Sequence, residues 1–257
     1  QSMAAMAAAD ALRTFMEEDN ITAYDPKWDK GLIRHLIVKT AFATGEVMVI
    51  LVINGKGIPN VSKLVEMLDD AIYEVGYSLE SVVLNIKKAE GVKKARSERE
   101  QAQAMSGEIM GDENIFIAGK NVIRDVFGDL EFEISPNSFY QVNPVQTEVL
   151  YGKALELAEL TGEETVLDLY CGLYDQVKAY CRSEVDAEGK KPVILDLYCG
   201  VGTIGLYCAD MAEAVVGIEI VKEAVVDANR NAVVNGIVNA RYICGKAEEL
   251  LPKYVAY

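Results

Sequence analysis

The chain has 257 residues and a formal net charge of −15; 51% of its residues are hydrophobic and 25% are charged. This composition is typical of a globular protein with a sizeable core, and it excludes a disordered or fibrous chain. The acidic balance argues against a nucleic-acid footprint over the whole chain. No apolar run reaches the ~18 residues of a membrane span, so we expect no membrane partner.

Cysteine and histidine usage restricts the chemistry further. The 5 cysteines are odd in number and form no CxxC pair, which argues against a disulfide framework and against a metal site. We therefore expect a cytoplasmic protein with no metal ligands. The single histidine, His35, falls in an apolar strand-like run, which favours a structural role over a catalytic one.

Residues 1–134 predict an α+β domain with a mostly antiparallel sheet. Residues 3–19 have the periodicity of a helix, and a second helix is expected between Asn60 and Gly76. Strands are expected at residues 32–39, 47–53, 81–87, 108–110, 115–118, 122–127 and 130–134. The strand at residues 81–87 leads into a basic stretch. The composition of this stretch favours a solvated loop over an RNA contact. Its cations are Lys87, Lys88, Lys93, Lys94, Arg96 and Arg99.

Residues 135–257 have a different pattern. Asn143 and Pro144 are typical of a helix start, and this helix is expected to run to about residue 160. Strands and helices then alternate, which predicts a parallel sheet with crossover helices. The strands are expected at residues 193–198, 214–220 and 240–244, and the helices at 204–211 and 222–235.

The most informative motif links the first two of these parallel strands. A strand runs into Gly200 and Gly202, which allow a sharp turn close to a ligand, and Glu219 ends the next strand, where a carboxylate can bind ribose hydroxyls. Asp196 is suited to hold the loop backbone, and Tyr198 offers an aromatic face to a ligand. This GxGxxG pattern fits a dinucleotide site, an S-adenosylmethionine site, or a tight turn without a ligand.

Several longer motifs resemble the RNA uracil-5-methyltransferases that act on ribosomal and transfer RNA. In the second half these motifs are ISPNSFYQVNP at 134–144, LDLYCGVGTIGL at 195–206, VGIEI at 216–220 and EAVVDANRNAVVNGIVN at 223–239. Residues 31–39 and 44–52 resemble the central domain that precedes the methyltransferase domain in this family. The resemblance implies an α/β architecture: an incomplete Rossmann-like S-adenosylmethionine-dependent methyltransferase domain, preceded by the α+β central domain.

The resemblance also implies a mechanism and a set of site residues. In this family a cysteine thiolate adds to C6 of a flipped uracil, C5 takes the methyl group, and a glutamate removes the C5 proton. The partner is ribosomal or transfer RNA, and the cofactor is S-adenosyl-L-methionine. By matched position, the cofactor-binding residues are Gln141, Tyr198, Gly200, Gly202, Thr203 and Glu219.

Three departures from the family lead to further expectations. The catalytic cysteine and glutamate of the family lie beyond Tyr257, so we expect no catalytic residue in this chain and no activity of this chain alone. Cys199, Cys208 and Cys244 are expected to be small buried residues. Lys246 stands where many members carry an acidic residue, which weakens an adenine contact there.

The third departure is an internal repeat. VLDLYCG at 166–172 is followed by ILDLYCG at 194–200, and we interpret residues 173–193 as an insertion or duplication. An incomplete sheet would leave an apolar edge unpaired, so we expect poor stability or self-association. The alternatives are a nicotinamide-dependent oxidoreductase that uses the glycine loop and a non-catalytic RNA-binding remnant.

Overall fold

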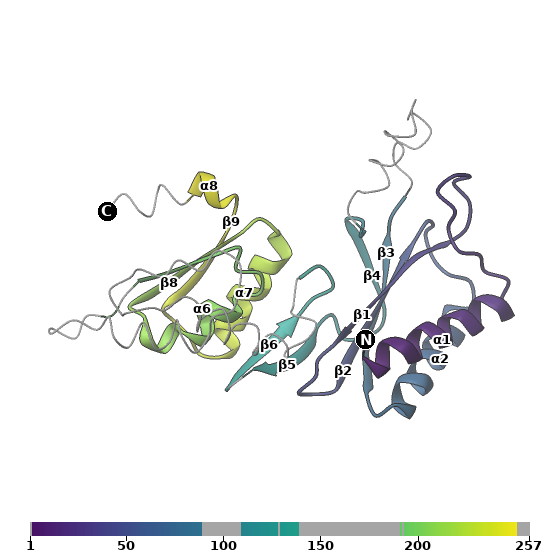
Figure 1. Cartoon of the computed structure of the whole chain (residues 1–257), viewed down its shortest axis with the longest axis horizontal. Coiled ribbons are helices and arrows are strands. Elements are labelled where there is room, and N and C mark those ends of the chain that lie inside the picture. The colour runs from purple at the N-terminus through teal and green to yellow at the C-terminus, as the bar shows by residue number, and fades with distance from the viewer. Residues whose placement is uncertain (1, 89–108, 128, 139–190, 192, 251–257) are drawn as a thin grey trace, which may run out of the picture. The chain divides into compact units, whose positions relative to one another are not determined.

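The computed structural model describes residues 2–88, 109–127, 129–138, 191 and 193–250 (Figure 1). By their contacts the residues divide into two units, Gln1–Ile123 and Arg124–Tyr257. The sequence placed a domain boundary between residues 134 and 135, whereas the contacts group residues 124–134 with the second unit. In the described part of the chain, no helix is long and apolar enough to cross a membrane.

The first unit is a four-stranded sheet with two helices, α1 and α2, that lie side by side (Figure 1). The strand order is β1-β2-β3-β4; β2 and β3 are parallel and the other neighbours are antiparallel. The elements are α1 (Met3–Glu18), β1 (Ile33–Thr40), β2 (Glu46–Ile53), α2 (Val61–Glu74), β3 (Ser78–Ile86) and β4 (Glu113–Gly119).

Apolar periodicity explains these elements. Helix α1 starts where the Ser2 hydroxyl accepts a hydrogen bond from the Ala5 N–H at 3.2 Å, and α2 ends before Gly76, whose φ is +84°. Both helices bury one apolar face against alternate residues of β2. The core includes Ala4, Ala8, Leu12, Phe15, Leu64, Leu68, Ile72, Val47, Val49, Leu51 and Ile53. Since α2 connects β2 to β3, these two strands are parallel.

One expected strand of the first unit is wrong. Ile109 and Met110 lie in a bend, and residue 108 lies outside the described residues. The reason is a side chain: the Asn85 amide accepts from the Gly111 N–H at 2.6 Å and donates to the Gly111 carbonyl at 2.8 Å. These bonds replace those of a strand, so the ladder with β3 begins only at Glu113.

The second unit contains a two-stranded sheet and a parallel three-stranded sheet of order β7-β8-β9. The strands are β5 (Ile123–Phe127), β6 (Leu130–Ile134), β7 (Val193–Leu197), β8 (Ala214–Glu219) and β9 (Ala240–Cys244). The helical segments are α6 (Thr203–Tyr207), η2 (Ala209–Met211), α7 (Lys222–Val234) and α8 (Ala247–Leu250). The alternation of strands and helices predicted from the sequence is confirmed, and with it the α/β class of this half.

The helix expected at residues 204–211 is divided into α6 and η2. The Asn239 amide donates to the carbonyls of Ala209 at 2.8 Å and Ala212 at 3.0 Å. These two carbonyls lie in η2 and directly after it, so the Asn239 amide stabilises the end of η2 and does not explain the division after Tyr207.

A row of polar side chains on α7 attaches β6 to the second unit. Asn235, Asn231 and Asp227, spaced one helical turn apart, accept hydrogen bonds from the N–H groups of alternate residues along the chain. These donors are Glu131 at 3.0 Å, Glu133 at 2.8 Å and Ser135 at 3.3 Å. This polar ladder explains why β6 groups with the second unit.

Some expectations fall outside the described residues. They concern the helix from residue 143, the first LDLYCG copy at 166–172 and most of the insertion at 173–193. The second copy, residues 194–200, forms β7 and the loop after it. Self-association through a sheet edge stays a prediction.

Candidate functional site

The candidate site lies where the three parallel strands of the second unit end. The N–H of Tyr198, after β7, donates to the Ile218 carbonyl at 2.7 Å, and the N–H of Gly245, after β9, donates to the Glu219 carbonyl at 2.9 Å. These bonds hold the three strand ends at one edge. In parallel α/β sheets, ligands bind outside the carboxyl ends of the strands.

The loop after β7 has a sharply turned backbone. Tyr198, Gly200 and Gly202 have φ values of +59°, +53° and +79°. For Tyr198 this left-handed conformation costs about 1–2 kcal/mol, and such strain is concentrated at functional sites. The buried carboxylate of Asp196 accepts a hydrogen bond from the Gly205 N–H at 3.0 Å, so the prediction that Asp196 holds the loop is confirmed.

Glu219 is fixed in orientation by backbone donors. One carboxylate oxygen accepts from the Gly200 N–H at 3.1 Å, and the other accepts from Ile220 at 2.8 Å and Val221 at 2.9 Å. A carboxylate offers about four acceptor positions, so the described residues leave one of them open, on the oxygen that faces Gly200. A single hydroxyl can bind there directly, and binding of two hydroxyls requires one backbone N–H to move away.

Tyr198 supplies an exposed aromatic surface at the same edge. Its side chain is 45% exposed, and its hydroxyl donates to Glu248 of α8 at 3.0 Å. This hydrogen bond and the Glu248 charge raise the pKa of Tyr198. The ring is held by its hydroxyl while much of its surface stays accessible. No motif in the sequence indicates Glu248, because it belongs to a helix of only four residues.

Tyr242 of β9 is a second residue that the sequence analysis missed. It is 4% exposed, and its hydroxyl donates to the Gly202 carbonyl at 3.1 Å. A Cβ atom at Gly202, Gly205 or Gly217 would overlap the Tyr242 side chain. The ring therefore fills the space that these glycines leave beneath the loop. The sequence does contain a signal for this contact. A large aromatic residue on the third strand can fill the space beside glycines on the neighbouring strand and helix.

The remaining predicted site residues differ in how the structure places them. Thr203 is the first residue of α6 and is partly buried beside Gly202. Tyr198, Gly200, Gly202, Thr203 and Glu219 thus lie together at one edge. Gln141 lies outside the described residues.

The cysteines near this site differ in accessibility. Cys199 and Cys208 are buried as expected, but the expectation is wrong for Cys244, which is exposed because it ends β9 at the open edge of the sheet. Burial raises the pKa of the Cys199 thiol well above its usual range, and the charges of Asp196 and Glu219 raise it further. Cys199 is therefore a neutral thiol and unsuited to act as a nucleophile.

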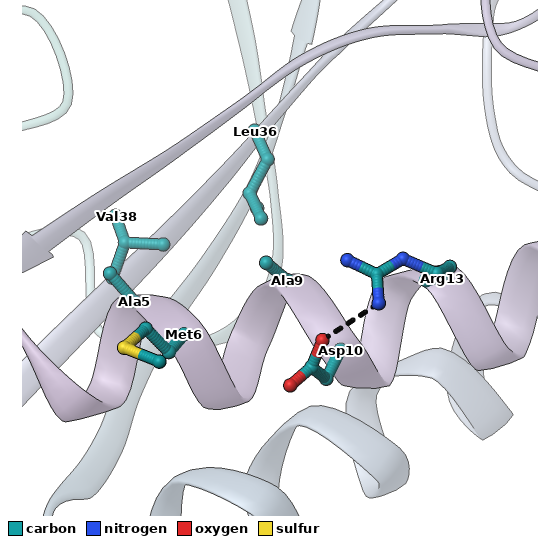
Figure 2. Close-up of a pocket in the computed structure, with 7 residues that line it drawn as sticks. All are labelled: Ala5, Met6, Ala9, Asp10, Arg13, Leu36 and Val38. Carbon is teal, nitrogen blue, oxygen red and sulfur yellow. Dashed lines mark hydrogen bonds and ion pairs between the residues drawn. The ribbon is translucent and has the colours of Figure 1, made fainter. Parts of the chain in front are cut away.

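A groove in the first unit lies between α1 and β1 (Figure 2). Small side chains at Ala5 and Ala9 hollow it, and Arg13 and Asp10 form an ion pair of 3.0 Å at its rim. The ion pair neutralises both charges, and the remaining lining is apolar. This groove contains no residue that the sequence analysis selected.

Comparisons with known proteins identify the relatives of this chain. A family model described as tRNA (Uracil-5-)-methyltransferase matches residues 179–255, which include the glycine loop and Glu219. An uncharacterized RNA methyltransferase of Caldanaerobacter subterraneus is 43% identical over 94% of this chain and 43% of its own length. One from Staphylococcus aureus is 37% identical over 95% of this chain and 44% of its own length.

A solved structure has a similar fold. The crystal structure of Pyrococcus abyssi tRNA (uracil-54, C5)-methyltransferase in complex with S-adenosyl-L-homocysteine matches with a TM-score of 0.59 and 25% sequence identity. The match covers 93% of this chain and 46% of that chain. The chain thus spans less than half the length of the relatives that it matches.

Proposed function

Since the chain belongs to the RNA (uracil-5-)-methyltransferase family, we propose that its second unit binds S-adenosyl-L-methionine for the methylation of a uridine at C5 in RNA. The observation that carries this proposal is the edge formed by Tyr198, Gly200 and Glu219. It supports a ligand that has a ribose and a flat base. The similar Pyrococcus abyssi enzyme was crystallised with the demethylated product of the same cofactor.

The residues at the edge have separate roles in this proposal. Glu219 accepts a ribose hydroxyl at its remaining acceptor position, and Tyr198 packs against the ligand with its exposed ring. Gly200 turns the backbone so that the ligand can approach closely. When bound, the cofactor supplies an electrophilic methyl group. Tyr198, Gly200 and Glu219 orient the cofactor and do not form or break a bond in methyl transfer.

The nucleophile is expected elsewhere in the whole protein. The proposed reaction needs a thiolate that adds to C6 of uracil. Cys199 and Cys208 are buried thiols, and the exposed Cys244 donates its thiol hydrogen to the Ile220 carbonyl at 3.5 Å. We therefore propose that the described residues contribute cofactor binding and do not catalyse methyl transfer by themselves. Ribosomal or transfer RNA as the substrate, and action in the cytoplasm, belong to the same proposal.

The proposal can be tested by calorimetric titration of the chain with S-adenosyl-L-homocysteine. We expect saturable binding that is weakened about 10-fold or more in Glu219→Gln, because the variant loses hydrogen bonds to a charged acceptor. Glu223→Gln is the matched control, since Glu223 is an exposed carboxylate in the first turn of α7. It removes the same charge and should bind like the wild type.

Two results would contradict the proposal. One is equal affinity of the wild type and Glu219→Gln, and the other is no binding by a chain whose circular dichroism shows a folded second unit. A parallel titration with NAD⁺ separates the nicotinamide alternative, because saturable NAD⁺ binding that depends on Glu219 would favour an oxidoreductase.

A further inference from the structure

One end of the first unit's sheet gathers cations and aromatic rings. At this end β1 begins, and β2 and β3 finish, since Ile33 pairs with Ile53 and Ile53 pairs with Ile86. Segments at residues 22–32, 54–57 and 87–88 therefore meet there (Figure 1). The N–H of Asn54 donates to the Leu32 carbonyl at 2.8 Å, which joins two of these segments directly.

The first segment forms a tight loop with an exposed tryptophan at its tip. The N–H of Asp25 donates to the Lys30 carbonyl at 2.7 Å, and the Asp25 carboxylate accepts from the Lys27 N–H at 2.8 Å. The loop holds Trp28 with 65% of its surface exposed, and the Lys27 ammonium lies 5.4 Å from the ring centroid. An ordered loop that leaves a tryptophan exposed offers a surface for a flat ligand.

A second ring links this loop to the sheet. The Arg34 guanidinium lies 4.0 Å from the centroid of the Tyr24 ring and donates to the Lys87 carbonyl at 3.2 Å. The Tyr24 hydroxyl donates to Asp29 at 3.3 Å. These contacts connect the tryptophan loop to the end of β3, where the basic stretch of the sequence begins.

Among the described residues of this end, cations outnumber carboxylates, although the chain as a whole carries a charge of −15. The cations are Lys27, Lys30, Arg34, Lys56, Lys87 and Lys88, and the carboxylates are Asp25, Asp29, Asp112 and Glu113. Asp25 and Asp29 already accept hydrogen bonds within the loop, whereas Lys27, Lys30, Lys56 and Lys88 are exposed. The surface therefore suits a polyanion that carries flat groups.

We propose that this end of the sheet contacts a single-stranded segment of RNA, with a base stacked on Trp28 and phosphates beside Lys27 and Lys30. The identity of the partner rests on the proposed function, in which RNA is the substrate. Base stacking on an aromatic side chain and phosphate binding by lysines are the two features of single-strand recognition. In a duplex the faces of the bases are stacked on one another, so duplex RNA could contact Lys27 and Lys30 but could not stack a base on Trp28.

The chain allows a direct test, because Trp28 is its 1 tryptophan. The intact chain is titrated with an unstructured RNA of about 12 nucleotides, and tryptophan fluorescence is measured. We expect saturable quenching, and weaker quenching by the same RNA in a duplex. Affinity should fall as the salt concentration rises. The logarithm of the binding constant should decrease linearly with the logarithm of the salt concentration, with a slope of about −0.7 for each phosphate that the protein neutralises.

Variants are compared by the fluorescence anisotropy of labelled RNA. Trp28→Ala should weaken binding at least about 5-fold, the lower limit for loss of one stacked base, and Trp28→Phe should restore part of it. Tyr73→Ala is the aromatic control, because Tyr73 is 79% exposed on α2. Lys27→Gln with Lys30→Gln should reduce the salt dependence, whereas Lys120→Gln, beyond the opposite end of β3, should not.

The outcomes separate this proposal from the previous one. Unchanged fluorescence on RNA binding, or equal RNA affinity of Trp28→Ala and the wild type, would overturn it, whatever the result for S-adenosyl-L-homocysteine. A blue shift of Trp28 emission with phosphatidylserine vesicles but not with RNA would also overturn it, in favour of a membrane surface. Normal S-adenosyl-L-homocysteine binding by Trp28→Ala, with an unchanged circular dichroism spectrum, would show that the variant has lost the RNA contact and kept both the cofactor site and its fold.

Discussion

Asn231 should be one of the most sensitive positions of the second unit. Its side chain is fully buried, and its amide oxygen accepts from the Glu133 N–H at 2.8 Å. Its amide nitrogen donates to the carbonyls of Glu133 at 3.4 Å and Val201 at 3.2 Å. The side chain therefore joins β6, α7 and the glycine loop through backbone groups that water does not reach.

Asn231→Ala should lower the free energy of unfolding of the second unit by about 3 kcal/mol. Each hydrogen bond contributes about 1 kcal/mol net, and the buried Glu133 N–H left without a partner adds to the loss. Asn235→Ala is the matched control, because Asn235 makes the same pair of bonds to Glu131, at 3.0 and 2.8 Å, but is partly exposed. Since water can replace these bonds, we expect a loss of about 1 kcal/mol.

The assay is urea unfolding followed by two signals. Far-ultraviolet circular dichroism reports on both units, whereas tryptophan fluorescence reports on the first, since Trp28 lies there. We expect Asn231→Ala to lower the midpoint of the second unit and to leave the fluorescence transition in place. Equal losses for Asn231→Ala and Asn235→Ala would refute the reasoning, because burial would then not determine the cost.

Three further predictions concern titration and reactivity. Burial lowers the pKa of His35, so its nuclear magnetic resonance titration should have a midpoint below the usual value of about 6.5. Hydrogen bonds lower the pKa of Asp19, and the one from Lys63 has the largest effect. Lys63→Met should therefore lose stability relative to the wild type, and this loss should be complete above about pH 4, where the Asp19 carboxylate is ionised in the unfolded chain. The difference in stability should vanish as pH falls through the lowered pKa of Asp19. The acid-unfolding curves of the wild type and Lys63→Met should therefore converge at low pH, and parallel curves would contradict this prediction. Mass spectrometry after brief alkylation should find Cys244 modified and Cys199 unmodified in the folded chain.

The sequence predicted the elements whose apolar periodicity determines their burial. Helices α1 and α2 and strands β1, β2, β5 to β9 formed close to their expected positions, because a buried face at helix or strand spacing is a local property. The end of the helical segment expected at 204–211 was not predictable in this way, since the distant Asn239 side chain binds the carbonyls there. The false strand at 108–110 has the same cause, a side-chain amide from another strand.

The site was predicted in part for a similar reason. Asp196 and Glu219 lie at the end of consecutive strands, so a motif of fixed spacing can place them. The contact between Tyr198 and Glu248, and that between Arg34 and Lys87 beside the Trp28 loop, arise from segments that only the folded chain brings together. Sequence spacing contains no information on these encounters.

The glycine loop shows why a motif indicates a fold more strongly than a ligand. Gly202 and Gly205, together with Gly217 on β8, are small because the Tyr242 ring lies against them. A chain without any ligand would still need these glycines to close its core. Ligand binding instead depends on the features that packing does not require: the strained, exposed Tyr198 and the remaining acceptor position of Glu219. Substitutions at these two residues can therefore test function without removing the interior on which the loop rests.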